Sequence, residues 1–532
     1  MNAPAPAAVP SPAMNLVTGT ASRYLLLAIN IGLGVVLLPF TVSRLGMADY
    51  GLWMLVASMT YYFQLLDLGY GSGLVRHVAD ADARQDLALV NQILSTFVVV
   101  YAGIGLLSVA GTAGVIAWVI PRFPNLTAEQ ITRAQAILAL VGVRIAVGFP
   151  MTVFGAATMA RQRFALNNTV AIVVALVNGA VTYLVLSMGH GLVTLVAATT
   201  TVSLASYGAY AWTARQAMPG LRIRPALFNS RLVRDVTTFS VYVFVIDIAI
   251  QVGFNLDNLV IGAALGTSAV AVYAVAMRLA DYQRQLCNQF NGLLFPVVVR
   301  LGAAGQAGAL RSVLIDGTRV ALMLVVGVTV CVVGFASPLV AHWMGPGFEG
   351  SLAPLYVLAL AGLFLVGRGP LGYILLGTGR HRLVAFVSLG EALANLALSI
   401  ALVRRYGLLG VALGTAIPVA LASLVILLPA ACRQAGLGVA SFGRLVAAAP
   451  LVGAVPAIAA IAAFRVALPP DSLPLVFGEG AIVGAIYLLT VCTLGLDRAV
   501  RARYFDHLRQ LASSLTIGRI GTARVTAPGV RA

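Results

Sequence analysis

The chain has 532 residues, of which 60% are hydrophobic and 10% are charged, and its mean hydropathy is +0.95. This composition excludes a soluble fold, because a soluble protein of this size does not need so much apolar surface, and it predicts a membrane protein with many spans. The formal net charge is +17, and every basic residue is Arg. The Arg residues stand singly or in pairs between apolar runs, a pattern typical of membrane-protein loops and not of a nucleic-acid-binding surface.

Taken in chain order, residues 1–19 are rich in Ala and Pro, and we expect a disordered tail. About fourteen apolar runs follow, each about 20 residues or longer and so long enough to span a membrane. We place them at 20–43, 50–75, 90–120, 132–155, 164–187, 191–213, 237–262, 268–297, 311–342, 352–377, 382–403, 407–431, 443–468 and 475–496. If the loops alternate between the two sides, most Arg residues fall on one side. This bias predicts that both termini are cytoplasmic.

Short segments of the first half recur about 220 residues later, which indicates an internal repeat. The matching pairs are Leu45-Gly46 with Leu265-Gly266, Gly148-Phe149-Pro150 with Arg368-Gly369-Pro370, and His190-Gly191 with Tyr406-Gly407. Six spans in each copy imply a parallel repeat, with both copies entering the membrane from the same side. We therefore predict an all-α polytopic membrane protein. Its parts are an N-lobe at 20–214, an Arg-rich linker at 215–236, a C-lobe at 237–432, two C-terminal helices at 443–496 and a basic cytoplasmic tail at 497–532.

Two consecutive spans of the predicted C-lobe carry polar stripes. On the first, Asp247, Gln251, Asn255 and Asn258 fall on one face of a helix. On the second, a set of polar residues covers one side, namely Arg278, Asp281, Arg284, Gln285, Asn288, Gln289 and Asn291. An ionisable group at the membrane centre costs at least ~2.5–3.5 kcal/mol, so such groups face a bundle interior or a wet cavity. We expect a central hydrated cavity between the lobes.

Three motifs of the first two spans resemble those of a known family. They are Ser22-Arg23, Asp49-Tyr50-Gly51-Leu52-Trp53 and Asp67-Leu68-Gly69, the last followed by Arg76. The chain resembles the Wzx-type polysaccharide-biosynthesis flippases of the multidrug/oligosaccharidyl-lipid/polysaccharide exporter superfamily. The resemblance implies two six-helix lobes in a bacterial inner membrane. It also implies a lipid-linked glycan substrate, an undecaprenyl-diphosphate-linked repeat unit of O-antigen (lipopolysaccharide), capsule or exopolysaccharide, and polysaccharide polymerase or export machinery as partners.

The arginines at membrane depth have two interpretations. They either donate paired hydrogen bonds to the diphosphate of such a substrate, or each is neutralised by a buried acid and stabilises the bundle. The candidate cavity residues are Arg144, Arg278, Arg284, Arg368, Gln251, Gln285 and Asn288. In the first half of the chain, Asp67 approaches the inner surface, where a helix cap or a contact between helices is the favoured interpretation over substrate binding.

Four acids are candidates for proton or sodium coupling, because a carboxyl group in a semi-dry cavity can bind a proton or a cation: Asp247, Asp257, Asp281 and Glu391. Asp281 has an alternative, since it can pair with Arg278 or Arg284 on its own helix. Asp257 falls near the outer end of its span, where it can lie at the water boundary. Glu391 can line the cavity or bond a neighbouring helix. The Cys and His residues show no ligand spacing, so we expect neither a metal nor another cofactor.

The predicted function is therefore a flippase working by alternating access, with no enzymatic activity. An ion-coupled multidrug antiporter of the same superfamily is the alternative, because acids as well as arginines lie at membrane depth. A membrane glycan polymerase, ligase or glycosyltransferase would need a large external loop for its catalytic residues. The outer segments 121–131 and 343–351 are short and hold no paired acids, so the sequence disfavours an enzyme.

Overall fold

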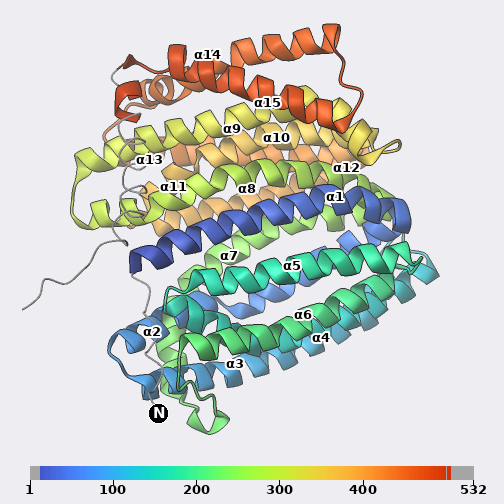
Figure 1. Ribbon diagram of the computed structural model, residues 1–532, viewed down its shortest axis with the longest axis vertical. Coiled ribbons are helices and arrows are strands. Elements are labelled where there is room, and N and C mark those ends of the chain that lie inside the picture. The colour runs from blue at the N-terminus through green and yellow to red at the C-terminus, as the bar shows by residue number, and fades with distance from the viewer. Residues whose placement is uncertain (1–11, 499, 505–532) are drawn as a thin grey trace, which may run out of the picture. The chain divides into compact units, whose positions relative to one another are not determined.

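The computed structural model describes residues 12–498 and 500–504, and the side chains in these ranges except those of residues 12–17, 238–255, 293 and 303. Within this part of the chain the regular structure is helical throughout (Figure 1). The predicted all-α fold is confirmed. The tails predicted at 1–19 and 497–532 fall largely outside the described residues.

The first half of the chain forms long helices joined by short turns and short helical segments of other types. In order they are α1 (Pro12–Tyr61), η1 (Tyr62–Asp67), α2 (Tyr70–Ala83), α3 (Leu87–Gly114), η2 (Val115–Val119), η3 (Ile120–Arg122), α4 (Ala128–Ala160), α5 (Phe164–Ser187), α6 (Leu192–Ala217) and η4 (Pro225–Leu227). The start of α4 is fixed by a capping box, in which Thr127 and Gln130 each bond the backbone N–H of the other.

The second half continues with α7 (Ser230–Leu265), α8 (Thr267–Ala303), α9 (Ala307–Met344), η5 (Glu349–Ser351), α10 (Leu352–Gly367), α11 (Gly369–Gly377), α12 (His381–Leu421), η6 (Ala422–Leu427), α13 (Leu428–Gln434), α14 (Val439–Ala467), α15 (Leu473–Thr490) and η7 (Val491–Gly495). Non-helical backbone at Gly46 divides α1, and non-helical backbone at Gly407 divides α12.

Ten helical segments of the described chain are long and apolar enough to cross a membrane. Segment 381–434 contains the predicted spans 382–403 and 407–431, and segment 18–67 contains span 20–43 and most of span 50–75. The predicted spans 237–262 and 268–297 lie in α7 and α8, which are not among the ten. A multi-span membrane fold is therefore confirmed, while the count of about fourteen spans stays a prediction.

The chain divides into two compact units. The first comprises Met1–Tyr282, Trp343–Ala361 and Arg380–Ile426, and the second comprises Gln283–His342, Gly362–Gly379 and Leu427–Ala532. In the first unit α1 packs along α5, α3 and α6 pack on α4, and α12 packs on α7 (Figure 1). In the second unit α14 packs on α15, and Tyr487 of α15 is buried, its hydroxyl donating to the Met323 carbonyl 2.8 Å away. The boundaries predicted for two lobes stay a prediction.

Candidate functional site

The second predicted span, 50–75, is broken in its last third by the motif Asp67-Leu68-Gly69. Leu68 and Gly69 both have left-handed backbone, with φ 52° and 74°, so the helical hydrogen bonds stop there. The Asp67 carboxylate accepts the backbone N–H of Gly71 at 3.2 Å, which caps the first turn of α2, and the Tyr101 hydroxyl at 2.6 Å. The favoured interpretation of this motif, a cap and a contact between helices, is confirmed.

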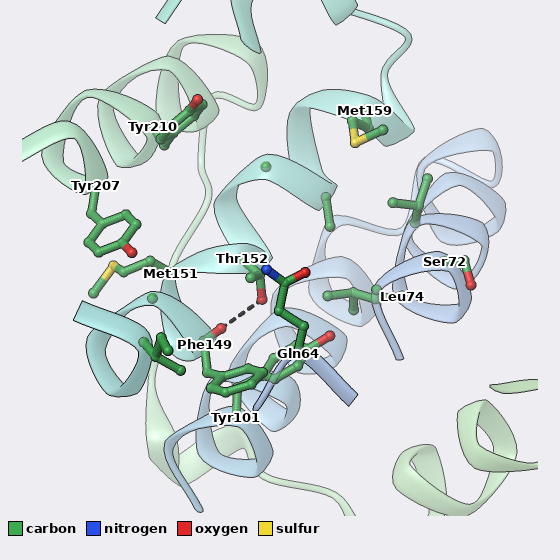
Figure 2. Close-up of a pocket in the computed structure, with 16 residues that line it drawn as sticks. Gln64, Ser72, Leu74, Tyr101, Phe149, Met151, Thr152, Met159, Tyr207 and Tyr210 are labelled. Atoms are coloured by element: carbon green, nitrogen blue, oxygen red, sulfur yellow. Dashed lines mark hydrogen bonds between the residues drawn. The ribbon is translucent and has the colours of Figure 1, made fainter. Parts of the chain in front are cut away.

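A cavity of about 680 Å³ lies beside this break, within the first unit. We call it the α4 cavity, because α4 supplies about half of its wall (Figure 2). Its lining residues are Gln64, Gly71, Ser72, Leu74, Val75, Tyr101, Ile145, Gly148, Phe149, Met151, Thr152, Gly155, Ala156, Met159, Tyr207 and Tyr210. None of these side chains carries a charge, so the wall offers neither a cation for a phosphate nor an anion for an organic cation.

Small residues and a proline open this space along α4. Gly148 and Gly155 lack side chains at the wall, and a Cβ at Gly148 would lie 2.6 Å from the Tyr207 hydroxyl. Pro150 lies within α4 and removes one backbone donor. The Tyr207 hydroxyl donates to the Arg144 carbonyl at 3.2 Å and thereby ties α6 to α4 beside the cavity. The close packing of α6 here depends on a residue without a side chain.

Asp257 of α7 lies at the centre of a second polar cluster, also in the first unit. It is only 1% exposed, and its Oδ2 accepts the Tyr273 hydroxyl at 2.7 Å and the Thr415 hydroxyl at 2.9 Å. Asn395 donates to Thr415 at 3.2 Å, and Ser399 donates to Asn395 at 3.0 Å. Asp257 therefore does not lie at a water boundary, as its place near the span's end allowed. The three helices α7, α8 and α12 enclose it.

One carboxylate oxygen of this cluster accepts no hydrogen bond in the described part of the chain. Within the described part of the chain, Asp257 Oδ1 has no hydrogen-bond partner. The hydroxyl of Tyr62 is also buried without a described partner, and it lies close enough to Asp257 to interact with its charge. Next to them, Asn258 donates to the Ser58 hydroxyl at 2.8 Å. The cluster thus combines one acid with several neutral oxygens, a set that suits a proton or a hard monovalent cation.

The two candidate arginines of the first unit are half-buried. The Arg278 guanidinium lies over the Tyr282 ring, 6.0 Å from its centroid, and beside the Tyr50 hydroxyl. Arg144 is the residue whose carbonyl accepts from Tyr207, one position before the cavity-lining Ile145. Both keep part of their side-chain surface accessible, as a group that binds an anion would require.

The remaining candidates of the second unit lie around α8 and the break between α10 and α11. Arg368 occupies that break, and both it and Arg284 are half-buried and interact within the protein. Asn291 donates to Asn288 at 3.1 Å and to the Val366 carbonyl at 3.0 Å. The Gln285 carbonyl accepts from Gln289 at 3.4 Å. Asn291 thus joins α8 to α10, whereas Asn288 is exposed and accepts a bond from its own helix, and the bond at Gln285 involves its backbone carbonyl.

The last four candidates differ in what the structure describes. Asp281 and Glu391, both in the first unit, are half-buried and interact within the protein. The side chains of Asp247 and Gln251 fall outside the described residues, so their roles stay predictions.

The sequence patterns did not reveal the α4 cavity. Its rings and methionines come from α3, α4 and α6, and none of these helices shows a polar stripe there. The only sequence signals are Gly148, Pro150 and Gly155, small or helix-breaking residues close together in an apolar run.

The fold is that of a known class of membrane transporters. It is similar to the lipid II flippase MurJ in an inward closed conformation, with 12% identity, a TM-score of 0.67, and coverage of 89% of this chain and 98% of that chain. It is equally similar, at a TM-score of 0.67 and 13% identity, to an inward-facing multidrug resistance MATE family transporter of the MOP superfamily, covering 77% of this chain and 98% of that one. These likenesses show that the chain shares the fold of both proteins.

Within this class, residues 16–301 match the family described as polysaccharide biosynthesis protein, and the chain belongs to that family. A relative from Bacillus subtilis (strain 168), the uncharacterized membrane protein EpsK, is 23% identical over 489 residues, which cover 90% of this chain and 95% of the relative.

Proposed function

We propose that the protein is a flippase that moves an undecaprenyl-diphosphate-linked oligosaccharide across the bacterial inner membrane by alternating access, with both termini cytoplasmic. The observation that carries this proposal is a fold shared with a lipid II flippase over 98% of that chain, in a member of the polysaccharide biosynthesis family. Translocation needs a path for a polar head through hydrocarbon, and no covalent chemistry. The lipid-linked substrate would come from, and be passed to, polysaccharide assembly machinery.

The diphosphate is held by arginine in this proposal. Arg278 supports this role best, because it is half-buried, is oriented by the Tyr282 ring, and lies on a helix with further polar residues. A guanidinium group donates two parallel hydrogen bonds to phosphate oxygens, which an ammonium group cannot do. Arg144, Arg284 and Arg368 are the further candidates for the same headgroup.

Ion coupling is assigned to Asp257 in this proposal. It is the candidate acid that the structure describes as fully buried, and Oδ1 lacks a hydrogen-bond partner there. A bare carboxylate in such a place costs several kcal/mol unless a proton or a cation joins it. Binding and release of that ion would then favour different conformations, which is the requirement for coupling.

The assay that tests the proposed function uses purified protein in liposomes with two separate cargoes. One arm measures flipping of labelled polyprenyl-diphosphate oligosaccharide, and the other measures transport of a cationic dye. We expect flipping in the first arm only, and a loss of at least tenfold in Arg278→Ala and Arg284→Ala. The control is Arg84→Ala, because Arg84 forms an exposed pair with Asp80.

The second candidate function is ion-coupled multidrug antiport, since the likeness to a MATE transporter reaches the same TM-score of 0.67. A cationic drug is usually held by an acid, and the wall of the α4 cavity carries none. Dye transport without glycan flipping would establish the antiporter and overturn the flippase. Flipping that persists in both arginine variants would leave the flippase but refute arginine as the headgroup ligand.

A further inference from the structure

The α4 cavity lies among helices that are long and apolar enough to cross a membrane, which implies a place at membrane depth. Its walls belong largely to three of the apolar segments that can span a membrane, 87–122, 128–160 and 192–217. The break at Leu68 and Gly69 lies beside it, and irregular backbone is tolerated at this depth only where it is buried or lines a cavity. The space is therefore available to a ligand that comes from the bilayer.

The hydroxyl groups of the wall are almost all used within the protein. Tyr101 donates to Asp67, Tyr207 to the Arg144 carbonyl, Thr152 to the Phe149 carbonyl at 2.6 Å and Ser72 to the Gly69 carbonyl at 3.1 Å. Among the described side chains of the wall, the Gln64 amide and the Tyr210 hydroxyl are the groups whose donors remain for a ligand, although the other hydroxyls can still accept a bond. Figure 2 shows Gln64 crossing the space, with Tyr207 and Tyr210 on one side and Ser72 and Leu74 on the other.

The small number of free donors in the wall favours an apolar chain over a glycan as the ligand. A sugar carries a hydroxyl on most of its carbons, and each one buried without a partner costs about 1–3 kcal/mol. The wall hydroxyls can accept from a few sugar hydroxyls, but only the Gln64 amide and the Tyr210 hydroxyl are left to donate to the sugar oxygens. What the wall does offer is aromatic rings and thioethers, with the Tyr101 and Phe149 rings stacked 6.1 Å apart and Met151 and Met159 at the rim. Such groups pack well against branched, unsaturated hydrocarbon.

We propose that the α4 cavity binds a segment of a polyprenyl chain, the lipid part of the carrier. This inference rests on the proposed function, which supplies a polyprenyl-linked cargo, and it assigns the tail a binding site that is separate from the arginine ligands of the headgroup. A volume of about 680 Å³ is within the range of small-molecule sites and holds several isoprene units but not a whole carrier chain. The rest of the chain stays in lipid.

The test uses the full-length protein in phosphatidylethanolamine–phosphatidylglycerol nanodiscs with a diazirine-bearing polyprenyl phosphate. Cross-linked peptides are mapped by mass spectrometry. We expect labelling of the α4 and α6 peptides that line the cavity. Unlabelled polyprenyl phosphate should reduce it at least tenfold, while added phosphatidylglycerol should leave it unchanged. Equal competition by the phospholipid would overturn the proposal in favour of a general acyl-chain site, and absence of label from the lining peptides would refute it.

Two substitutions sharpen the assignment. Thr152→Trp fills the cavity and should lower labelling at least tenfold, whereas Thr201→Trp should not. Thr201 is the matched control, since both hydroxyls bond their own helix and both side chains are exposed. Gln64→Leu should keep labelling within twofold, because the chain needs no polar partner, and a tenfold loss there would identify a polar ligand instead. Flipping activity without cavity labelling would refute this inference alone, while labelling without flipping would refute the proposed function alone.

Discussion

Gly46 and Gly266 adopt nearly the same backbone conformation, with φ 80° and ψ 162° at the first and φ 86° and ψ 176° at the second. This region of conformational space is almost confined to glycine. The two residues occupy corresponding positions in the predicted repeat, and each interrupts a helix. A short sequence match thus corresponds here to a shared backbone turn, which supports an internal repeat at this point of the chain.

Gly51, five residues after the first of these turns, lies directly against the backbone of Thr267. A Cβ at Gly51 would lie 1.8 Å from the Thr267 carbonyl oxygen, and a backbone atom cannot rotate away. We expect Gly51→Ala to lower the free energy of unfolding by about 1–3 kcal/mol through overpacking. Denaturant titration of the purified protein in detergent measures this change in the free energy of unfolding.

The control for that substitution is Gly32→Ala in the same helix, where a Cβ would meet nothing within 4 Å. There the helix propensity of Ala should leave stability unchanged or raise it by about 0.5–1 kcal/mol. If the two variants unfold at the same denaturant concentration, Gly51 does not pack against the Thr267 backbone as closely as the structure describes.

The other two sequence matches of the repeat differ in structure. Pro150 lies inside the continuous helix α4, whereas Pro370 follows a break at Arg368. Gly191 is an extended N-cap, whereas Gly407 has φ 56° inside α12. Glycine and proline permit a break without requiring one, and packing against neighbours decides. The sequence therefore predicted helices and their interruptions well, but not the geometry of each interruption.

The candidate site, too, could be predicted only in part from the sequence. The local cap at Asp67 could be predicted, because its partner Gly71 lies one turn away. The burial of Asp257 could not, since its partner Thr415 is 158 positions distant in the chain. The α4 cavity left no polar pattern because most of its hydroxyls bond nearby groups. Periodicity identifies the polar face of one helix, but not which distant side chains complete a site.

Asp67 and Tyr101 form a pair whose contribution can be measured directly. We expect Asp67→Ala to cost about 1–3 kcal/mol of stability, because both the α2 cap and the acceptor of Tyr101 are lost. Tyr101→Phe should cost about 0.5–1.5 kcal/mol. In a double-mutant cycle the two effects should be non-additive by at least about 0.5 kcal/mol. Full additivity would mean that this hydrogen bond contributes nothing.

Coupling through Asp257 gives a prediction about transport. Asp257→Asn should abolish the dependence of flipping on an ion gradient, because the amide binds neither a proton nor a cation at this position. This dependence is measured by comparing the flipping rate with and without an imposed proton or sodium gradient. Asp80→Asn serves as control, since Asp80 forms only an exposed pair with Arg84. Gradient dependence that survives in Asp257→Asn but disappears in Asp281→Asn or Glu391→Gln would transfer the role to those acids.

The acid Asp316 at the start of α9 holds three groups of the second unit together. It accepts from Arg319 at 3.0 Å and from the Tyr504 hydroxyl at 3.3 Å, and lies 3.6 Å from Arg503. The Arg319 side chain is 9% exposed and also donates to the Leu445 carbonyl at 2.9 Å. Removing Asp316 therefore leaves a buried cation without its carboxylate, with the Leu445 carbonyl and the neutral Tyr504 hydroxyl beside it.

We expect Asp316→Ala to destabilise the protein by about 3 kcal/mol or more, as removal of one partner of a buried ion pair does. Asp80→Ala removes the partner of Arg84 in a pair whose side chains are 69% and 63% exposed, and it should cost about 1 kcal/mol or less. Detergent unfolding curves of both variants make the comparison. Tyr504→Phe removes the hydroxyl contact of 3.3 Å, and its effect should fall between those of the two Asp variants. An Asp316→Ala effect no larger than that of Asp80→Ala would mean that solvent reaches Arg319.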